Sequence, residues 1–281
     1  MINNYRLKSK HNNRDILLDI RFNSKTNNSD LILFVHGFKG FKDWGPFNQV
    51  ADWFVEQGFA YAKLNLSHNG TTAEHPCDFV DLEAFGNNTF SIELDDLQVV
   101  IDFLFSENSQ IPSNIWNNKK LHLIGHSRGG GLAVLKAAEE SRVSSLITWA
   151  GINDLSKRWP QPVLDEWKEK GVLYIFNART NQDMPLYYTL VEDVLNNDER
   201  INIPKAVKKL NIPHLIVHGT NDETLPWQMA TEMKAWREEG ELFIIDDANH
   251  TFGGKHPWDS EELSDDFLKV VEKTLEFIKR V

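Results

Sequence analysis

The sequence has little of several features that mark whole classes of proteins. Cys77 is the only cysteine among 281 residues, so no intrachain disulfide can form and a cysteine-based zinc site is not expected. No apolar run approaches the ~18 residues that a membrane-spanning helix needs. The first residues also lack the charged and then apolar pattern of a secretory signal. We therefore expect a cytoplasmic protein without a membrane partner.

Positive charge is scarce as well. The chain holds 30 Lys and Arg against 41 Asp and Glu, which gives a formal net charge of −11. Such a charge repels nucleic acid and anionic lipid surfaces, so neither is expected as a partner. The hydrophobic content of 41% is ordinary for a globular protein of this length. A small molecule remains as the expected partner, and the oligomeric state stays open.

The most informative stretch is 119–133. An apolar run typical of a buried parallel strand ends in Gly-His-Ser-Arg-Gly, and a segment rich in Ala and Leu follows at helical spacing. A serine at the apex of such a turn takes a strained backbone conformation, and the strand and helix on either side of it pass close together. The residues two positions before and two positions after the serine must therefore have little or no side chain. Gly125 and Gly129 occupy those positions. The pattern predicts a nucleophile elbow that exposes the Ser127 hydroxyl beside a helix N-terminus.

The rest of the chain alternates between strand and helix patterns. A β-hairpin is predicted from 5–10 and 16–22, because the asparagines between them favour a turn. Further buried strands are predicted at 31–35, 59–66, 146–150, 213–217 and 242–245. Amphipathic helices are predicted at 48–57, 92–105, 227–236 and 259–281. The alternation predicts an α/β protein with a mostly parallel central sheet flanked by helices.

At the elbow residues the chain resembles the α/β-hydrolase superfamily, and the resemblance extends from residue 31 to the end. Within it the chain is similar to small serine hydrolases akin to dienelactone hydrolases, to the catalytic domains of prolyl oligopeptidases, and to bacterial cinnamoyl (feruloyl) esterases. Two departures are visible. Dienelactone hydrolases of the type form carry cysteine where Ser127 stands, and the propeller of prolyl oligopeptidases has no room here.

The resemblance implies a chain order of Ser, then Asp, then His for the catalytic residues, and Ser127, Asp222 and His250 follow it. Each comes directly after a separate predicted strand, and loops at one edge of a parallel sheet meet in space. Acyl transfer needs a nucleophilic hydroxyl, a base whose pKa lies near neutral pH and a carboxylate that orients this base. These residue types in these positions predict a Ser-His-Asp triad.

Each partner of the serine has rivals in the sequence. Asp154 and Glu223 are alternative acids, and Asp222 is favoured because it lies in a Gly-x-x-Asp loop that ends in a proline turn. His256 is an alternative base, but His250 follows the last apolar strand more closely. The resemblance also implies an oxyanion hole made by two backbone N–H groups.

Those two donors are assigned to Phe38, after the His-Gly pair that ends the strand 31–35, and to Arg128, directly after the elbow serine. The side chains of Arg128 and Lys39 either attract a substrate carboxylate or remain solvated. His68 and His75 are expected to be solvated residues at the rim of the pocket. No cofactor and no metal ion are expected, because no ligand cluster at metal spacing is present.

The segment 153–210 breaks the strand and helix alternation. It is rich in aromatic residues, and it carries a β-like pair at 172–177 and 184–188. Because it is too long for an ordinary loop, we interpret it as a lid inserted between core parts 1–152 and 211–281. An additional helix-strand unit of the main sheet is the alternative.

The resemblance therefore implies a serine hydrolase that cleaves carboxylic esters of small or medium acyl groups. An aminopeptidase-like or thioesterase activity is the second possibility. A non-enzymatic binding protein on the same fold is the third, because fold alone does not determine function.

Overall fold

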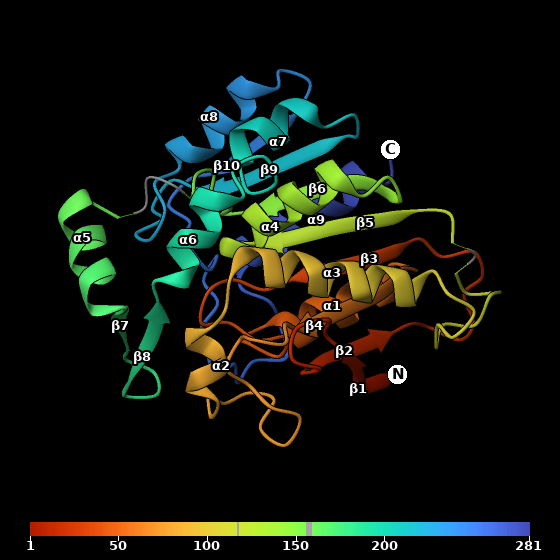
Figure 1. Cartoon of the computed structure of the whole chain (residues 1–281). Helices are drawn as coiled ribbons and strands as arrows, with labels where there is room; N and C mark the ends of the chain where they lie inside the picture. Colours follow the sequence, from red (N-terminus) through yellow and green to blue (C-terminus); the bar gives the residue numbers. More distant parts are fainter. Residues whose placement is uncertain (117, 156–158) are drawn as a thin grey trace.

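The computed structural model describes residues 1–116, 118–155 and 159–281, and Figure 1 follows the chain through them. The strands are Ile2–Lys8 (β1), Asp15–Arg21 (β2), Leu31–Val35 (β3), Ala60–Asn65 (β4), Leu121–His126 (β5), Val143–Trp149 (β6), Val172–Asn177 (β7), Gln182–Tyr187 (β8), His214–Gly219 (β9) and Glu241–Ile245 (β10). The helices are Phe47–Glu56 (α1), Leu82–Gly86 (α2), Phe90–Leu104 (α3), Arg128–Glu139 (α4), Gln161–Lys170 (α5), Thr189–Asn196 (α6), Ile203–Lys209 (α7), Gln228–Trp236 (α8) and Asp265–Ile278 (α9).

In the described part of the chain, eight strands form one sheet in the order β1-β2-β4-β3-β5-β6-β9-β10. β1 pairs with β2 and β2 with β4 in antiparallel register, which confirms the predicted hairpin at the sheet edge. Every neighbouring pair from β4 to β10 is parallel. This architecture confirms the predicted fold class. Parallel strands end at one edge, so the loops after β3, β5, β9 and β10 lie together there.

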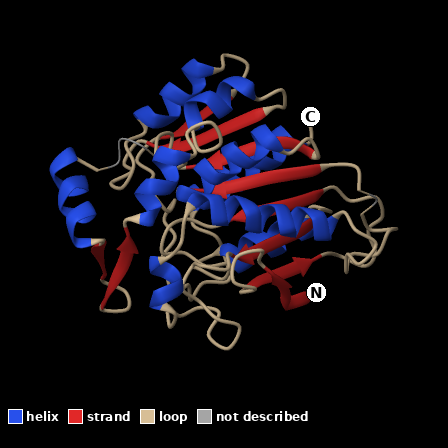
Figure 2. Ribbon diagram, viewed as in Figure 1, coloured by secondary structure: helices blue, strands red, loops and turns tan. Residues whose placement is uncertain are grey.

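Helices cover both faces of the sheet, as Figure 2 shows. Side chains alternate along β3, so Leu33 and Val35 join one apolar core whereas Ile32 and Phe34 join the other. The first core includes residues of α3, α4, α7 and α8, and the second includes residues of α1 and α9. Burial on both faces explains why the central strands read as continuous apolar runs rather than as alternating ones.

Beneath the loop after β3 lies a cluster of buried charges that the sequence pattern did not predict. The ammonium groups of Lys42 and Lys63 lie 2.8 and 3.2 Å from the same carboxylate oxygen of Asp19, and both also pair with Asp43. The two lysines are only 2% and 1% exposed. Burial lowers the pKa of Lys63, and the carboxylates of Asp43 and Asp19 oppose that shift. The cluster ties β2 and β4 to the loop after β3.

The helices differ from the predicted ones mainly at their ends. The last helix was predicted from residue 259, which is wrong, because α9 begins at Asp265. Ser264 caps it by accepting a hydrogen bond from the N–H of Phe267, and such a cap marks where a helix starts. The short helix α2 was not predicted. Among the described residues, no helix combines the length and apolar character needed to cross a membrane.

The segment 153–210 contains more helix than expected. The predicted hairpin is present as β7 and β8, but α5, α6 and α7 accompany it, so the expectation of a segment without alternation was wrong. Figure 1 shows α5 and the β7–β8 hairpin standing apart at the left, beyond the C-terminal ends of the parallel strands. The indole N–H of Trp167 in α5 donates to the carbonyl of Leu186 in β8 at 2.7 Å, which joins the two elements. The division at 152 and 210 stays a prediction.

Candidate active site

Ser127 occupies the sharp turn between β5 and α4. Its backbone has φ 57° and ψ −122°, a left-handed conformation that is strained for a residue with a side chain. A Cβ at position 125 would lie 2.1 Å from the carbonyl oxygen of Gly129, and one at position 129 would lie 2.3 Å from that of Val35. Only glycine fits at both positions. The predicted elbow geometry is therefore present at Ser127.

The structure brings Ser127, His250 and Asp222 together. The Nε2 atom of His250 lies 3.0 Å from the Ser127 hydroxyl, and its Nδ1 lies 2.8 Å from the Oδ2 of Asp222. Ser127 follows β5, Asp222 follows β9 and His250 follows β10, so three strand ends position the three side chains. This arrangement allows a proton to pass from the hydroxyl to the imidazole while the carboxylate fixes the ring.

Asp222 is held by more donors than the sequence indicated. Its Oδ1 accepts hydrogen bonds from the backbone N–H groups of Thr224 and Leu225, both at 2.8 Å. Its Oδ2 also lies 3.0 Å from the Nε2 of His218, a histidine that is fully buried. Burial opposes ionisation of Asp222, but the hydrogen bonds from His218 and His250 outweigh it and hold the pKa far below the ordinary value. The carboxyl group is therefore ionised at neutral pH.

His126 packs beside the elbow. Its Nε2–H donates to the carbonyl oxygen of His250 at 2.9 Å, and the two rings lie 5.0 Å apart. Burial, together with the nearby His250, lowers the pKa of His126 to about 3. His126 is therefore neutral at ordinary pH and supports the backbone of His250 without adding charge to the site.

The loop after β3 lies directly against the elbow. A Cβ on Gly37 would come within 2.9 Å of the Ser127 Cβ, so the backbone next to Phe38 packs on the serine. His36 fixes this loop because its Nδ1–H donates to the carbonyl of Gly37 at 2.9 Å. Burial lowers the pKa of His36 to about 4, so this ring is neutral. The assignment of the Phe38 and Arg128 N–H groups to an oxyanion hole remains a prediction.

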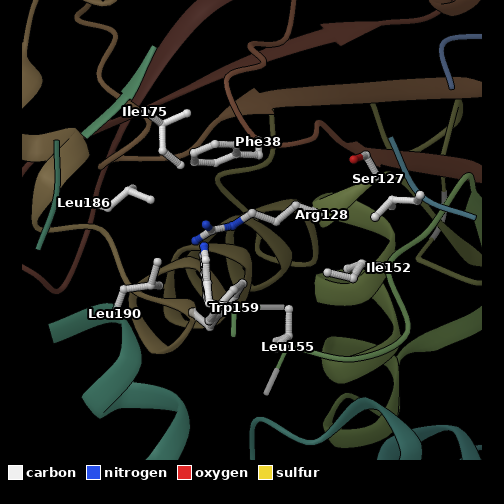
Figure 3. Close-up of a pocket in the computed structure, with 11 residues that line it drawn as sticks. Phe38, Ser127, Arg128, Ile152, Leu155, Trp159, Ile175, Leu186 and Leu190 are labelled. Atoms are coloured by element: carbon white, nitrogen blue, oxygen red, sulfur yellow. The ribbon is translucent and has the colours of Figure 1, made fainter. Parts of the chain in front are cut away.

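Two cavities open on either side of Ser127, and both are also lined by Phe38. Figure 3 shows the first, a cavity of about 110 Å³. Its other walls are Phe90, Arg128, Ile152, Leu155, Trp159, Ile175, Leu186, Leu190 and Leu225. The second is a wider groove of about 320 Å³ on the His250 side, which Lys39, Arg179 and His256 also line. Ile175 and Leu186 belong to the β7–β8 hairpin, so the segment 153–210 forms part of the first cavity.

The Arg128 side chain makes a buried ion pair rather than lying in solvent. Its Nε donates to the Oε2 of Glu93 at 3.1 Å, and its Nη2 lies 3.0 Å from the Oε1. Burial raises the pKa of Glu93, and the Arg128 guanidinium opposes that rise. Lys39 has its ammonium 6.0 Å from the centre of the Phe38 ring, and burial lowers its pKa. The sequence left the surroundings of both side chains open and carried no signal that Glu93 pairs with Arg128.

The rival residues occupy other positions. The hydrogen bond to the His250 ring comes from Asp222, whereas Glu223 accepts from the backbone N–H of His250 at 3.4 Å. The Nδ1 of His256 accepts from the backbone N–H of Gly45 at 3.0 Å. His75 is exposed, as expected.

The solvated position expected for His68 was wrong. This histidine is 1% exposed, and its Nδ1 lies 2.7 Å from the Ser67 hydroxyl. Burial lowers its pKa to about 4. The polar character of a loop in the sequence therefore does not by itself predict that its side chains are exposed. Among the described residues, no group of three or more His, Cys, Asp or Glu side chains is arranged to hold a metal ion.

The family model described as "Alpha/beta hydrolase family" matches residues 32–261. The chain belongs to this family, and it is a hydrolase by that membership. A curated relative named "Putative esterase/lipase 2", from Mycoplasma pneumoniae, is 24% identical over 242 residues that cover 78% of this chain and 81% of the relative.

Solved structures show the same fold. Est1E from Butyrivibrio proteoclasticus with bound ferulic acid superposes with a TM-score of 0.71 at 19% identity, covering 97% of this chain and 99% of that one. Dienelactone hydrolase from Anabaena variabilis superposes with a TM-score of 0.61 at 16% identity, covering 98% and 96%. Both belong to groups that the sequence resemblance named.

Proposed function

We propose that this protein is a serine carboxylesterase that hydrolyses esters of small or medium acyl groups. The observation that carries the proposal is the hydrogen-bonded chain from Ser127 through His250 to Asp222, with distances of 3.0 and 2.8 Å. Family membership and the esterase name of the curated relative support the same class of reaction.

In the proposed mechanism, His250 Nε2 takes the proton from the Ser127 hydroxyl as its oxygen attacks the ester carbonyl. Asp222 keeps the Nδ1–H tautomer in place and stabilises the imidazolium that forms. The tetrahedral intermediate collapses when His250 returns the proton to the alcohol oxygen. Water then attacks the acyl-serine with His250 again as base, and this step releases the acid. The mechanism requires no cofactor.

The negative charge of the intermediate falls on the former carbonyl oxygen. We assign its stabilisation to the backbone N–H groups of Phe38 and Arg128, one from the loop after β3 and one from the first turn of α4. Each such donor contributes about 3 kcal/mol to transition-state stabilisation. Gly37 supports this assignment because its backbone lies against Ser127.

The two cavities suggest where the halves of the ester bind. The apolar cavity of about 110 Å³ suits a compact acyl group, and the wider groove of about 320 Å³ suits the alcohol. The first cavity is somewhat smaller than the roughly 150 Å³ of an apolar cavity that binds benzene. Ferulic acid, the molecule bound to the structural relative Est1E, makes aromatic acyl groups a reasonable part of the substrate panel. The segment 153–210 would act as the lid that shapes this acyl site.

A substrate panel tests the proposal. Wild-type protein and Ser127→Ala are compared on p-nitrophenyl butyrate, methyl ferulate and an aminoacyl naphthylamide. The proposal predicts turnover of at least one ester and its loss in the variant. Turnover of the naphthylamide alone would instead favour an aminopeptidase-like enzyme, and no turnover of any ester by folded protein would contradict the proposal.

A further inference from the structure

Among the described residues that line the apolar cavity beside Ser127, Arg128 is the one with a charged side chain. Figure 3 shows this side chain extending from beside Ser127 into the ring of apolar walls. The Arg128 side chain is 11% exposed. Its Nη2 atom is buried and lies 3.0 Å from Glu93, but within the described part of the chain neither of its N–H groups makes a well-directed hydrogen bond. A buried donor without an acceptor is unfavourable, so such atoms in proteins usually meet a ligand or water.

The position of this guanidinium is fixed by its surroundings. Its Nε donates to Glu93, which in turn accepts from the side-chain amide of Asn88 at 2.7 Å. The ring of Phe90 lies 4.2 Å from the guanidinium carbon and that of Phe38 lies 5.7 Å from it. Aromatic rings cover the flat face of a guanidinium and leave its N–H groups, which lie in its plane, to hydrogen bond. The free donor is therefore presented in a set direction.

The charge of Arg128 is already balanced. Glu93 lies 3.0 Å from Nη2 and is 3% exposed, so the pair carries little net charge into the cavity. A substrate carboxylate placed there would add an uncompensated charge to apolar surroundings, which is unfavourable. A neutral oxygen can accept the free N–H without that penalty.

We infer that Arg128 is a specificity residue that recognises a neutral oxygen, such as a hydroxyl or ether, at the far end of the acyl group. The inference rests on the proposed ester hydrolysis and names its substrate class: acyl groups that are apolar along their length and carry an oxygen at the tip. A site with a buried donor discriminates strongly against an analogue that lacks the acceptor.

Matched esters test the inference. Methyl esters of straight-chain acids with four to eight carbons are compared with their terminal hydroxyl derivatives and with the corresponding dicarboxylic acid monomethyl esters. At the best-fitting length, kcat/KM for the hydroxylated ester should exceed that of the plain ester by about tenfold or more, as expected for a hydrogen bond to a charged group. The carboxylate form should be the poorest of the three.

Variants assign the preference to Arg128. Arg128→Met should reduce the ratio of hydroxylated to plain ester to about one. Because that change leaves Glu93 buried without its cation, Arg128→Met/Glu93→Gln provides a second form that keeps the acceptor for Asn88. Arg142→Met is the control, because Arg142 also pairs with a glutamate, Glu140, but lies after the far end of α4. Its ratio should match that of the wild type.

The inference is wrong if the wild type shows no preference at any length, if the carboxylate form is best, or if the preference survives in both Arg128 variants. Calorimetry measures ester binding without turnover, so it distinguishes failure of the recognition site from failure of the proposed function. Ser127→Ala should bind the hydroxylated ester about tenfold more tightly than the plain one, and adding Arg128→Met should abolish the difference. If that binding difference is found but the wild type turns over no ester, the recognition site at Arg128 is supported and the proposed esterase activity is contradicted.

Discussion

The Nε2 atom of His218 lies 3.0 Å from the Oδ2 of Asp222, the same carboxylate oxygen that lies 2.8 Å from the Nδ1 of His250. His218 is fully buried, and the carbonyl oxygen of Leu225 is also 3.0 Å from its Nε2. Both neighbours are acceptors, so Nε2 carries the proton. His218 therefore positions the carboxylate that orients His250.

Replacing His218 by leucine should lower the kcat for ester hydrolysis by about tenfold, because the carboxylate loses one of its donors and holds the His250 ring less firmly. KM should change little, since His218 lines neither cavity at Ser127. Steady-state kinetics on p-nitrophenyl butyrate check this. His75→Leu, at an exposed position, is the control, and an unchanged kcat in the His218 variant would remove the positioning role.

The buried charge cluster should contribute strongly to stability. Lys63→Met leaves Asp19 and Asp43 with one ammonium group between them, and breaking a buried pair in this way lowers the free energy of unfolding by about 3 to 5 kcal/mol. Urea unfolding followed by circular dichroism measures the change. The matched control is Lys170→Met, because Lys170 pairs with Glu166 at the surface, where water screens an ion pair and leaves it little effect on stability. Equal effects of the two substitutions would contradict this account of the cluster.

Buried histidines should make the protein less stable in mild acid. Burial lowers the pKa of His36 and of His68 to about 4, and the pKa of His126 and of His214 to about 3. Below the unfolded pKa of about 6.5 the unfolded chain therefore binds protons that the folded chain does not, and stability falls as the pH falls. Asp96 opposes this loss of stability, because burial raises its pKa to about 6. Near pH 5 the folded chain therefore binds one proton at Asp96 that the unfolded chain does not.

The net effect of the four histidines and Asp96 should be a decrease of about 5 kcal/mol in the free energy of unfolding between pH 6.5 and pH 5, at about 1.4 kcal/mol per histidine and pH unit. Urea titrations at pH 7 and pH 5 measure it. His214→Gln should make the decrease smaller. A protein that is equally stable at both pH values would show that these histidines are protonated in the folded state.

The fold and the position of the site could be predicted because the sequence carries local signals for them. The apolar runs at β3, β5 and β9 are continuous because those strands are buried on both faces, and Gly125 and Gly129 mark a turn where a Cβ cannot fit. Asp222 and His250 were found because strand ends at one edge of a parallel sheet meet. These signals depend on neighbours along the chain.

Contacts between distant parts of the chain gave no such signal. Glu93 meets Arg128 across 35 positions, and Lys63 meets Asp43 across 20. Both lysines of the charge cluster look like surface residues in the sequence, and only the packing of the loop that carries Lys42 against β2 and β4 buries them. His68 was assigned to solvent because its neighbours in the sequence are polar, although the folded chain buries it. The helices α5 to α7 were missed because short, weakly patterned helices are stabilised mainly by packing rather than by their own sequence.

The most direct test of the central claim is covalent labelling of Ser127. Folded wild-type protein is treated with a fluorophosphonate probe, and the adduct is located by peptide mass spectrometry. The account predicts one adduct, on Ser127, that is absent in Ser127→Ala and forms far more slowly in His250→Ala. No adduct on the folded wild type, or labelling at the same rate without His250, would contradict it.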